Sequence, residues 1–184
     1  VKKAAEMDPN GLATNISDIG KILYELKLFK PASTIFEIAV ANKESKNYVL
    51  DNFYLGNSLY FDNTRNDIKP DPIALQRADL AYGAVIEASP KTQDAYLYRA
   101  RTNSLLENDE MTIKYYNDYV SIVTEKGPEE LAKPATVKKL IESYNTAGAS
   151  YANTDKAKAI EYFNKALVID PANQYALDSL KSLK

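Results

Sequence analysis

Apolar residues recur along most of the chain at steps of three and four positions. Such series occur near both ends of the chain: Ile16, Ile19, Gly20 and Leu23, and then Ile160, Phe163, Ala166 and Leu167. Steps of three and four place side chains on one face of a helix, whereas strands alternate every second residue. Long runs of Val, Ile and Thr at strand spacing are lacking. The pattern therefore predicts an all-α fold.

The helical pattern repeats. A small residue recurs inside the first helix of each expected helix pair, and these anchor residues, Gly20, Gly56, Ala100 and Gly148, are separated by 36, 44 and 48 residues. Each spacing is a unit of about 34 residues lengthened by a loop insertion. We therefore expect four tandem units, with the differences in length confined to loops.

The positions after each anchor also correspond. Small residues follow in the second helix at Ala32, Ala78 and Ala159, and aromatic residues follow four positions later at Phe36, Tyr82, Tyr116 and Phe163. The small residues would let two antiparallel helices approach closely. Each ring would fill the space between neighbouring pairs and bury about 150–250 Å². A single pair cannot bury its apolar face alone, so the pairs have to stack.

This pattern resembles the tetratricopeptide repeat (TPR) family, whose unit is a helix-turn-helix of about 34 residues. The resemblance is strongest over 159–171, the second helix of the fourth unit, and weakest in the third unit, which has Asn103, Thr112 and Tyr119 at key positions. It implies a right-handed superhelical solenoid of antiparallel helix pairs with about four repeats and a C-terminal capping helix. The first helix of each pair would line a concave face.

The expected organisation divides the chain into seven ranges. They are the end of a truncated upstream repeat (1–12), repeat 1 (13–48), repeat 2 with a loop insertion near 62–72 (49–92), repeat 3 (93–126), a junction and the start of a long helix (127–140), repeat 4 (141–172) and a capping helix (173–184). The upstream remnant is inferred because Asp8-Pro9-Asn10 resembles the end of the fourth unit, Asp170-Pro171.

Two of these ranges raise further hypotheses. The insertion at 62–72 is rich in Asp, Asn and Pro, which predicts a solvated loop. Its clustered oxygen ligands also suggest calcium, but the spacing and the central glycine of a calcium-binding loop are absent. The junction contains Gly127, Pro128 and Pro134, so it is a place where the stack could flex.

Composition excludes several function classes. The chain has no Cys and no His, which removes thiolate or imidazole metal sites and the usual nucleophile–base pairs. The net charge of −2 argues against nucleic acid as a partner, and no apolar run is long enough to span a membrane. Phosphate-cradling glycine motifs are also absent. We therefore predict a non-enzyme with no cofactor and no metal site.

A binding groove is the main functional prediction. The chain has 14 Tyr and no Trp, and tyrosine is favoured at interfaces. First-helix positions not needed for packing would line the concave face, and these candidate binding residues are Lys21, Tyr24, Asn57, Tyr60, Arg101, Ser104 and Asn145. A polar, mildly basic groove with tyrosine walls suits an extended peptide.

The leading hypothesis is thus a protein-interaction scaffold that binds a peptide or a partner segment. The alternative is a glycan- or small-molecule-binding helical-repeat domain of a bacterial surface or uptake protein, which would be favoured if Tyr24, Tyr60 and Tyr98 were exposed and clustered in one aromatic pocket. Self-association through the N-terminal end is a third possibility. The two-carboxylate clamp of some family members is not matched, because Ser17, Asp94 and Tyr98 replace its residues. The absence of Cys suits an exported or periplasmic protein and also a cytoplasmic one.

Overall fold

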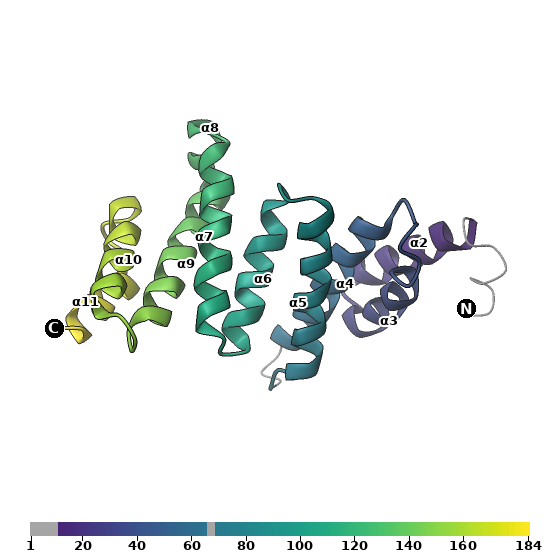
Figure 1. The fold of residues 1–184 in the computed structure, drawn as a ribbon, viewed down its shortest axis with the longest axis horizontal. Helices are drawn as coiled ribbons and strands as arrows, with labels where there is room; N and C mark the ends of the chain where they lie inside the picture. Colours follow the sequence, from purple (N-terminus) through teal and green to yellow (C-terminus); the bar gives the residue numbers. More distant parts are fainter. Residues whose placement is uncertain (1–10, 66–68) are drawn as a thin grey trace. The chain divides into compact units, whose positions relative to one another are not determined.

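The computed structural model describes residues 11–65 and 69–184, and this part of the chain is built from helices (Figure 1). They are α2 (Gly11–Glu25), α3 (Phe29–Ala39), α4 (Tyr48–Thr64), α5 (Pro72–Ala88), α6 (Gln93–Leu105), α7 (Asp109–Glu125), α8 (Pro128–Leu131), α9 (Pro134–Tyr151), α10 (Lys156–Ile169) and α11 (Gln174–Ser182). No strand occurs within the described ranges. The all-α prediction is confirmed.

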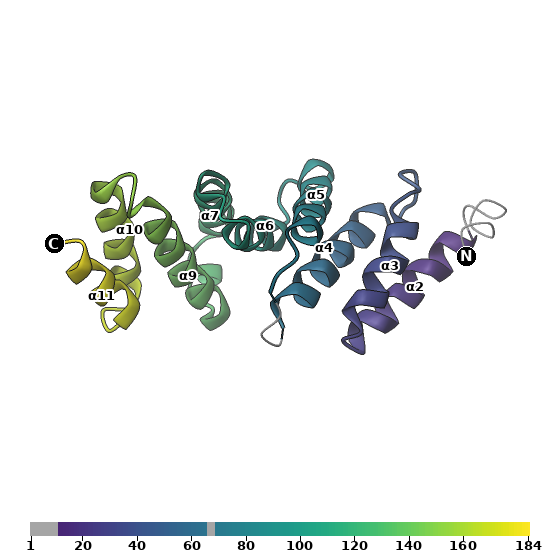
Figure 2. The ribbon, with the colours of Figure 1, turned by 90° about the horizontal axis from the view of Figure 1, so that it is seen from below.

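The chain divides into two compact units, residues 1–102 and 103–184, which we call the N-terminal and the C-terminal unit. In the N-terminal unit α2 packs on α3, α3 on α4, and α4 on α5 (Figure 2). In the C-terminal unit α7 packs on α9, α9 on α10, and α10 on α11. The division lies inside α6, next to the buried Asn103 at which the third repeat departs from the pattern.

The pairs that have a glycine anchor are organised around an aromatic ring that lies against it. A Cβ atom added to Gly20 would lie 2.7 Å from the Phe36 ring, and one added to Gly56 would lie 2.6 Å from the Tyr82 ring. Both rings are fully buried. Since real Cβ contacts are never this short, the glycines create the space that the rings occupy. This confirms the predicted role of the small anchors in these pairs.

The fourth unit has the same contact in a looser form. A Cβ atom at Gly148 would lie 3.0 Å from the ring of Phe163, which is 1% exposed. The facing Ala159 is fully buried, as are Ala32 and Ala78 at the corresponding positions of the first two units. The same register of small and aromatic residues therefore operates in both units of the chain.

The tight turns between paired helices also occur at equivalent positions in the repeats. Lys27 and Glu107 are the non-glycine residues with positive φ in the described part of the chain, at 57° and 56°. Each lies seven positions after its anchor, Gly20 or Ala100, in the turn between the two helices of a pair. Two non-glycine residues in the left-handed region at equivalent positions show that the first and third units use one turn geometry.

Side chains fix several helix starts. Asp71, Asn108, Asp155 and Asn173 each accept a hydrogen bond from a backbone N–H in the first turn of α5, α7, α10 and α11. Such caps satisfy donors that the helix itself cannot satisfy. Because each of these residues directly precedes its helix, they also set where the helices begin.

One detail differs from the expectation. Helix α4 continues to Thr64, so the insertion near 62–72 is a loop only after that residue. In the predicted capping helix, Ala176 is buried, and Tyr175 is 55% exposed with its ring edge-on to Phe163. The upstream remnant, with Asp8-Pro9-Asn10, lies outside the described residues.

Replacing an anchor glycine by alanine should lower stability although alanine is the better helix former. Overpacking a core costs about 1–3 kcal/mol, against a propensity gain of about 1 kcal/mol. We expect Gly56→Ala to lower the free energy of unfolding in urea, because Tyr82 is buried and cannot move away. Gly83→Ala is the control and should lose less stability, since its Cβ would lie 3.2 Å from the Arg99 guanidinium and requires a shift of only a few tenths of an ångström.

A double-mutant cycle tests the same contact in the first pair. Phe36→Leu should relieve the crowding caused by Gly20→Ala, so the double variant should lose less stability than the two single variants together. Strict additivity of the two losses would show that the ring and the glycine are not coupled.

The fourth unit should depend on its ring in the same way. Phe163→Ala removes a buried side chain and should cost about 3–5 kcal/mol, measured by urea unfolding followed by circular dichroism. Val168→Ala, on the same helix but 84% exposed, is the control and should change stability by less than about 0.5 kcal/mol. A small loss for Phe163→Ala would contradict the repeat register.

Candidate functional site

Half-buried aromatic rings form a connected row in the N-terminal unit. We call this row the aromatic ridge, and its members are Tyr24, Phe29, Tyr60, Phe61 and Tyr98. Phe61 is the central ring, with centroids 5.4 Å from Phe29, 5.3 Å from Tyr60 and 5.6 Å from Tyr98. Tyr24 adjoins Phe29 at 5.4 Å. The ridge therefore brings together side chains from α2, α3, α4 and α6.

The ridge rests on the buried core of the same unit. Tyr98 stacks on Tyr82 with centroids 5.9 Å apart and an interplanar angle of 16°. Tyr24 packs edge-on against Tyr54 at 5.1 Å, and Tyr54 stacks on Phe36 at 5.4 Å. The rings that lie against the anchor glycines thus support the rings that reach the surface.

A shallow hollow of about 340 Å³ opens at one end of the ridge. It is lined by Tyr24, Glu25, Lys27, Phe29 and Phe61. Three rings and the stem of a lysine make most of this wall apolar. The hollow includes Tyr24 but neither Tyr60 nor Tyr98, so the three tyrosines named in the glycan hypothesis do not share it.

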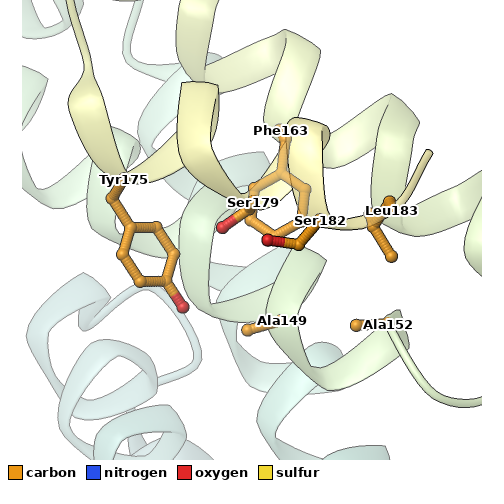
Figure 3. A pocket seen from close by; sticks show the side chains of 7 residues that line it. All are labelled: Ala149, Ala152, Phe163, Tyr175, Ser179, Ser182 and Leu183. Atoms are coloured by element: carbon orange, nitrogen blue, oxygen red, sulfur yellow. The ribbon is translucent and has the colours of Figure 1, made fainter.

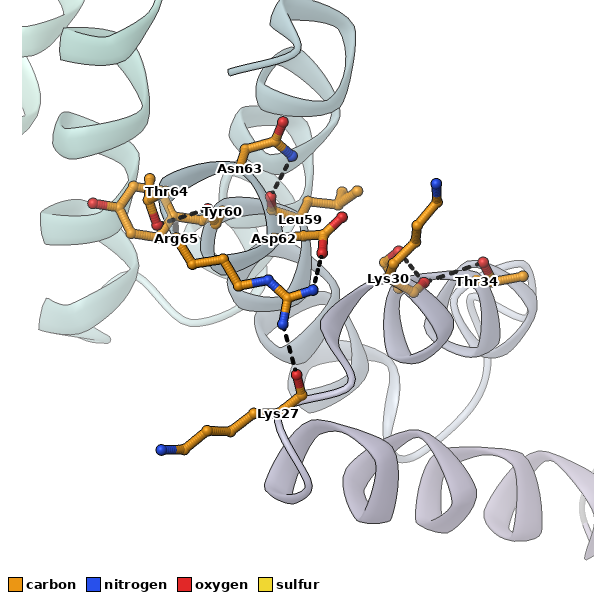
Figure 4. A network of polar contacts seen from close by, with 10 residues as sticks. Lys27, Lys30, Thr34, Leu59, Tyr60, Asp62, Asn63, Thr64 and Arg65 are labelled. Carbon is orange, nitrogen blue, oxygen red and sulfur yellow. Dashed lines mark hydrogen bonds and ion pairs between the residues drawn. The ribbon is translucent and has the colours of Figure 1, made fainter. Parts of the chain in front are cut away.

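Arg65 holds this end of the ridge in place (Figure 4). Its Nη1 donates to the Lys27 carbonyl at 3.1 Å, and its Nη2 donates to Asp62 Oδ1 at 2.8 Å. The guanidinium also lies 5.4 Å from the centroid of the Phe29 ring. One side chain therefore joins the end of α4 to the turn between α2 and α3.

Four of the predicted groove residues lie in or beside the ridge. Tyr24 and Tyr60 belong to it, and the guanidinium carbon of Arg101 lies 5.1 Å above the Tyr98 ring. Lys21 is one turn before Tyr24 on α2, with its side chain 26% exposed and 3.6 Å from Asp18. These residues give the ridge two flanking cations.

The prediction that Asn57 lines a groove is wrong. Asn57 is only 5% exposed, and its Oδ1 accepts a hydrogen bond of 2.9 Å from the Tyr82 hydroxyl. Tyr82 is the ring that fills the second pair, and a buried phenol needs a polar partner. Asn57 supplies that partner, so its side chain turns into the core.

The remaining two predicted residues belong to the C-terminal unit. Ser104 is exposed near the end of α6. Asn145 is half-buried, and its Nδ2 donates to Asn173 Oδ1 at 3.0 Å, so it supports the side chain that caps α11. The role of Asn145 in the structure is therefore to join α9 to α11.

The sequence prediction missed Phe29, Phe61 and Arg65. Phe61 directly follows a predicted groove residue, so the pair Tyr60–Phe61 was the available signal. Phe29 begins the second helix of its pair and Arg65 follows the end of α4, in a segment predicted to be a loop. Neither position can be placed near the ridge by helical periodicity alone.

Acidic residues of the insertion near 62–72 have roles other than binding calcium. Asp62 pairs with Arg65, and Asp71 caps α5 by accepting from Ile73 N–H at 2.9 Å. The rest of the hypothesis involves residues 66–68, which lie outside the described part. Across the described ranges, His, Cys, Asp and Glu side chains nowhere gather in a group of three suited to a metal ion.

One carboxyl group is buried beside the ridge-bearing helices. Asp51 on α4 is fully buried and accepts a hydrogen bond of 2.7 Å from the Ser17 hydroxyl on α2. Burial raises the pKa of Asp51, while the bond from Ser17 and the nearby Lys21 oppose the rise. This contact links the first helices of two successive pairs.

The first described helix also carries an apolar stripe. Ile19, Ile22 and Leu26 on α2 are 50%, 57% and 65% exposed. Their spacing places them on one face of the helix. The predicted N-terminal self-association surface includes this face, although residues 1–10 lie outside the described part.

These helix pairs, with a ring on each anchor glycine, define the class of fold: the chain has the fold of tetratricopeptide-repeat proteins. The resemblance seen in the sequence is thereby confirmed for the fold. No helix within the described ranges has the length and apolar character needed to cross a lipid bilayer.

Several solved structures have a fold similar to that of this chain. One is the C-terminal part of a TPR repeat-containing protein from Cytophaga hutchinsonii, with 23% identity and a TM-score of 0.70 over 97% of this chain and 63% of that one. MamA has 18% identity and a TM-score of 0.70 over 93% and 80% of the two chains.

A third is YrrB, described as a TPR protein with an unusual peptide-binding site. It has 17% identity and a TM-score of 0.52 over 97% and 96% of the two chains. The present chain spans about 63% of the Cytophaga hutchinsonii structure. No protein-family model matches the sequence, and a search of curated proteins gives no match either.

Tyr24 of the ridge should make stability depend on alkaline pH. Burial and the neighbouring Tyr98 raise the pKa of Tyr24 to about 12, although a hydrogen bond with Asn57 opposes the rise. The folded state then holds this proton more tightly than the unfolded chain, whose tyrosine pKa is about 10. Stability should therefore fall as pH rises from about 10 to about 12.

Urea unfolding of the wild type and Tyr24→Phe across this range checks the prediction. The variant should lose less stability between the two ends of the range, because it lacks one of the raised phenols. Tyr175→Phe, at an exposed position, is the control and should follow the wild type. Identical pH profiles for Tyr24→Phe and the wild type would contradict the assignment.

Proposed function

We propose that this chain is a non-catalytic protein-interaction module that binds an extended peptide segment of a partner across the aromatic ridge. The observation that carries the proposal is the ridge itself. It presents four connected rings, Tyr24, Tyr60, Phe61 and Tyr98, at a partly exposed surface. Lys21 and Arg101 flank the row.

The chemistry of the ridge suits a peptide. Tyrosine and phenylalanine provide large contact areas while losing little conformational entropy, which is why aromatic residues dominate binding hot spots. Phenol hydroxyls can bond to backbone amides, and the flanking cations can bond to carboxylates. An extended segment offers both kinds of group along its length.

The rigidity of the ridge supports the same proposal. The supporting stacks on Phe36 and Tyr82 and the Arg65 bridge hold the rings before a partner arrives. A preformed surface avoids much of the cost of ordering side chains on binding. The description of YrrB, which names a peptide-binding site, shows that this fold can bind peptides.

A non-catalytic role is supported by the residues present. The chain lacks His and Cys, the side chains that most often act as general base or activated nucleophile. Several acidic side chains of the N-terminal unit are held in ion pairs with Arg65, Arg77 and Arg99. These ion pairs favour a stabilising role for the carboxylates over a role in proton transfer.

The hollow at the end of the ridge favours a second candidate, a glycan-binding domain. Three rings around about 340 Å³ could stack on the apolar face of a sugar. Lys27 and Glu25 at its wall could bond to hydroxyl groups. This candidate differs from the first because its ligand would use the hollow and not the row from Tyr60 to Arg101.

Selection from a display library of random peptides tests the proposal. Peptides that bind the wild type should bind Lys21→Ala/Arg101→Ala at least about tenfold more weakly, corresponding to a loss of about 1.4 kcal/mol. Lys43→Ala/Lys91→Ala is the matched control, because it removes two exposed positive charges from the same unit. The control should bind like the wild type.

Two outcomes would overturn the peptide proposal. One is the absence of any peptide enriched above background, and the other is equal binding to both double variants. A glycan array probed with the wild type and Phe61→Ala would then test the second candidate. If a glycan binds the wild type but not Phe61→Ala, the hollow would be assigned as a glycan-binding site.

A further inference from the structure

The fourth repeat differs from the first at the positions one and four residues after the anchor. One and four residues after the anchor, the first repeat has Lys21 and Tyr24, whereas the fourth has Ala149 and Ala152. The second repeat has a tyrosine, Tyr60, at the latter position. Two long side chains are therefore replaced by methyl groups in the fourth repeat.

A hollow of about 200 Å³ lies where these side chains are missing (Figure 3). Its lining comes from α9, α10 and α11 of the C-terminal unit: Ala149, Ala152, Phe163, Tyr175, Ser179, Ser182 and Leu183. We call this hollow the alanine socket. Phe163 is 1% exposed and closes its floor, whereas Tyr175 is 55% exposed and stands at its rim.

The rim is held in place. The Phe163 and Tyr175 rings meet edge to face with centroids 6.2 Å apart. Asn173, which caps α11, is bonded to Asn145 on α9 at 3.0 Å. The two helices that form the walls are thus joined at one end by a side-chain bond.

The lining residues define what the alanine socket can accept. None of the seven carries a charge, so a charged group would lose its hydration without gaining a partner. Alanine methyls, the Leu183 side chain and a ring favour an aliphatic group. The hydroxyls of Ser179 and Tyr175 at the wall and rim could bond to a peptide backbone that enters beside it.

The volume of the alanine socket limits the size of the group that it can bind. Sites for free metabolites and cofactors usually have about 300–1,000 Å³, whereas an apolar cavity of about 150 Å³ holds a molecule the size of benzene. The alanine socket lies between these values and close to the smaller one. It is therefore suited to one side chain of a larger ligand and not to a whole small molecule.

We infer that the alanine socket binds one uncharged aliphatic side chain, of leucine, isoleucine or methionine size, from an extended partner peptide. The peptide origin of this side chain rests on the proposed function. The preference for an aliphatic group rests on the socket alone. In the first repeat Tyr24 occupies the equivalent position, so the two units present different surfaces from the same repeat register.

Disulfide tethering tests the preference directly, because the chain contains no cysteine. Ser179→Cys places one thiol in the lining and changes little in size. The variant is equilibrated with an equal mixture of the 3-methylbutyl and hydroxyethyl disulfides of cysteamine under mild reducing conditions, and the two adducts are counted by mass spectrometry. Tethering makes a weak contact measurable through its high effective concentration.

We expect the methylbutyl adduct to exceed the hydroxyethyl adduct by at least about tenfold at Ser179→Cys, from burial of an aliphatic group. Ala172→Cys, at an exposed loop position, is the matched control and should take both equally. Adding Ala149→Leu should fill the socket and abolish the preference. Ala152→Val, a smaller change, should reduce it even where Ala149→Leu fails to fold.

Equal adducts at Ser179→Cys and Ala172→Cys would overturn the inference, and so would a preference that survives filling of the socket. The result is independent of the peptide selection, whose variants lie at Lys21 and Arg101 in the N-terminal unit. If the methylbutyl adduct is preferred but no peptide is selected, the socket inference is supported and the peptide proposal is refuted. If peptides are selected but the two adducts form equally, the peptide proposal is supported and the socket inference is refuted.

Discussion

The contact between an anchor glycine and a ring on the second helix controls the packing within each pair that uses it. The ring follows the glycine by 16 positions in the first repeat, 26 in the second and 15 in the fourth. The ring lies so close to the helix backbone that no Cβ fits at the contact: a Cβ atom added to Gly56 or Gly20 would lie only 2.6 Å or 2.7 Å from the ring. The same rings continue outward, because Phe36 stacks on Tyr54 and Tyr82 stacks on Tyr98. Loss of one glycine contact would therefore displace the support of the next helix as well.

The choice of tyrosine at the second of these positions has a consequence for the surface. A phenylalanine there would need only space, but the Tyr82 hydroxyl is buried and must bond to a polar group. Asn57 turns inward to accept it and is also bonded to Tyr24 in the ridge. One buried amide thus connects the core ring of the second pair to an exposed ring of the first. The core and the candidate binding surface consequently depend on the same side chains.

The sequence was sufficient for the fold because the fold depends on short-range, periodic information. Glycine anchors, facing alanines and following rings recur at fixed spacings, and those spacings determine both the helix pairs and their register. The same spacings placed Tyr24, Tyr60 and Arg101 on one surface. They failed for Asn57, because its orientation is decided by a hydroxyl 25 residues away, which periodicity does not describe. They also failed for Arg65, which lies just after the end of α4 and bonds to the carbonyl of Lys27, 38 residues away in a turn.

A single register that carries different side chains also explains how one fold can offer unlike surfaces. The position four residues after the anchor does not take part in the glycine–ring contact, so its size is free to vary. A tyrosine there, as at Tyr24, adds a ring to the surface, whereas an alanine, as at Ala152, leaves a recess above the core ring. Gly148 and Phe163 still pack against each other in the fourth repeat, so the recess leaves the glycine–ring contact of this pair intact. Variation at this position therefore changes recognition while the packing that defines each pair is retained.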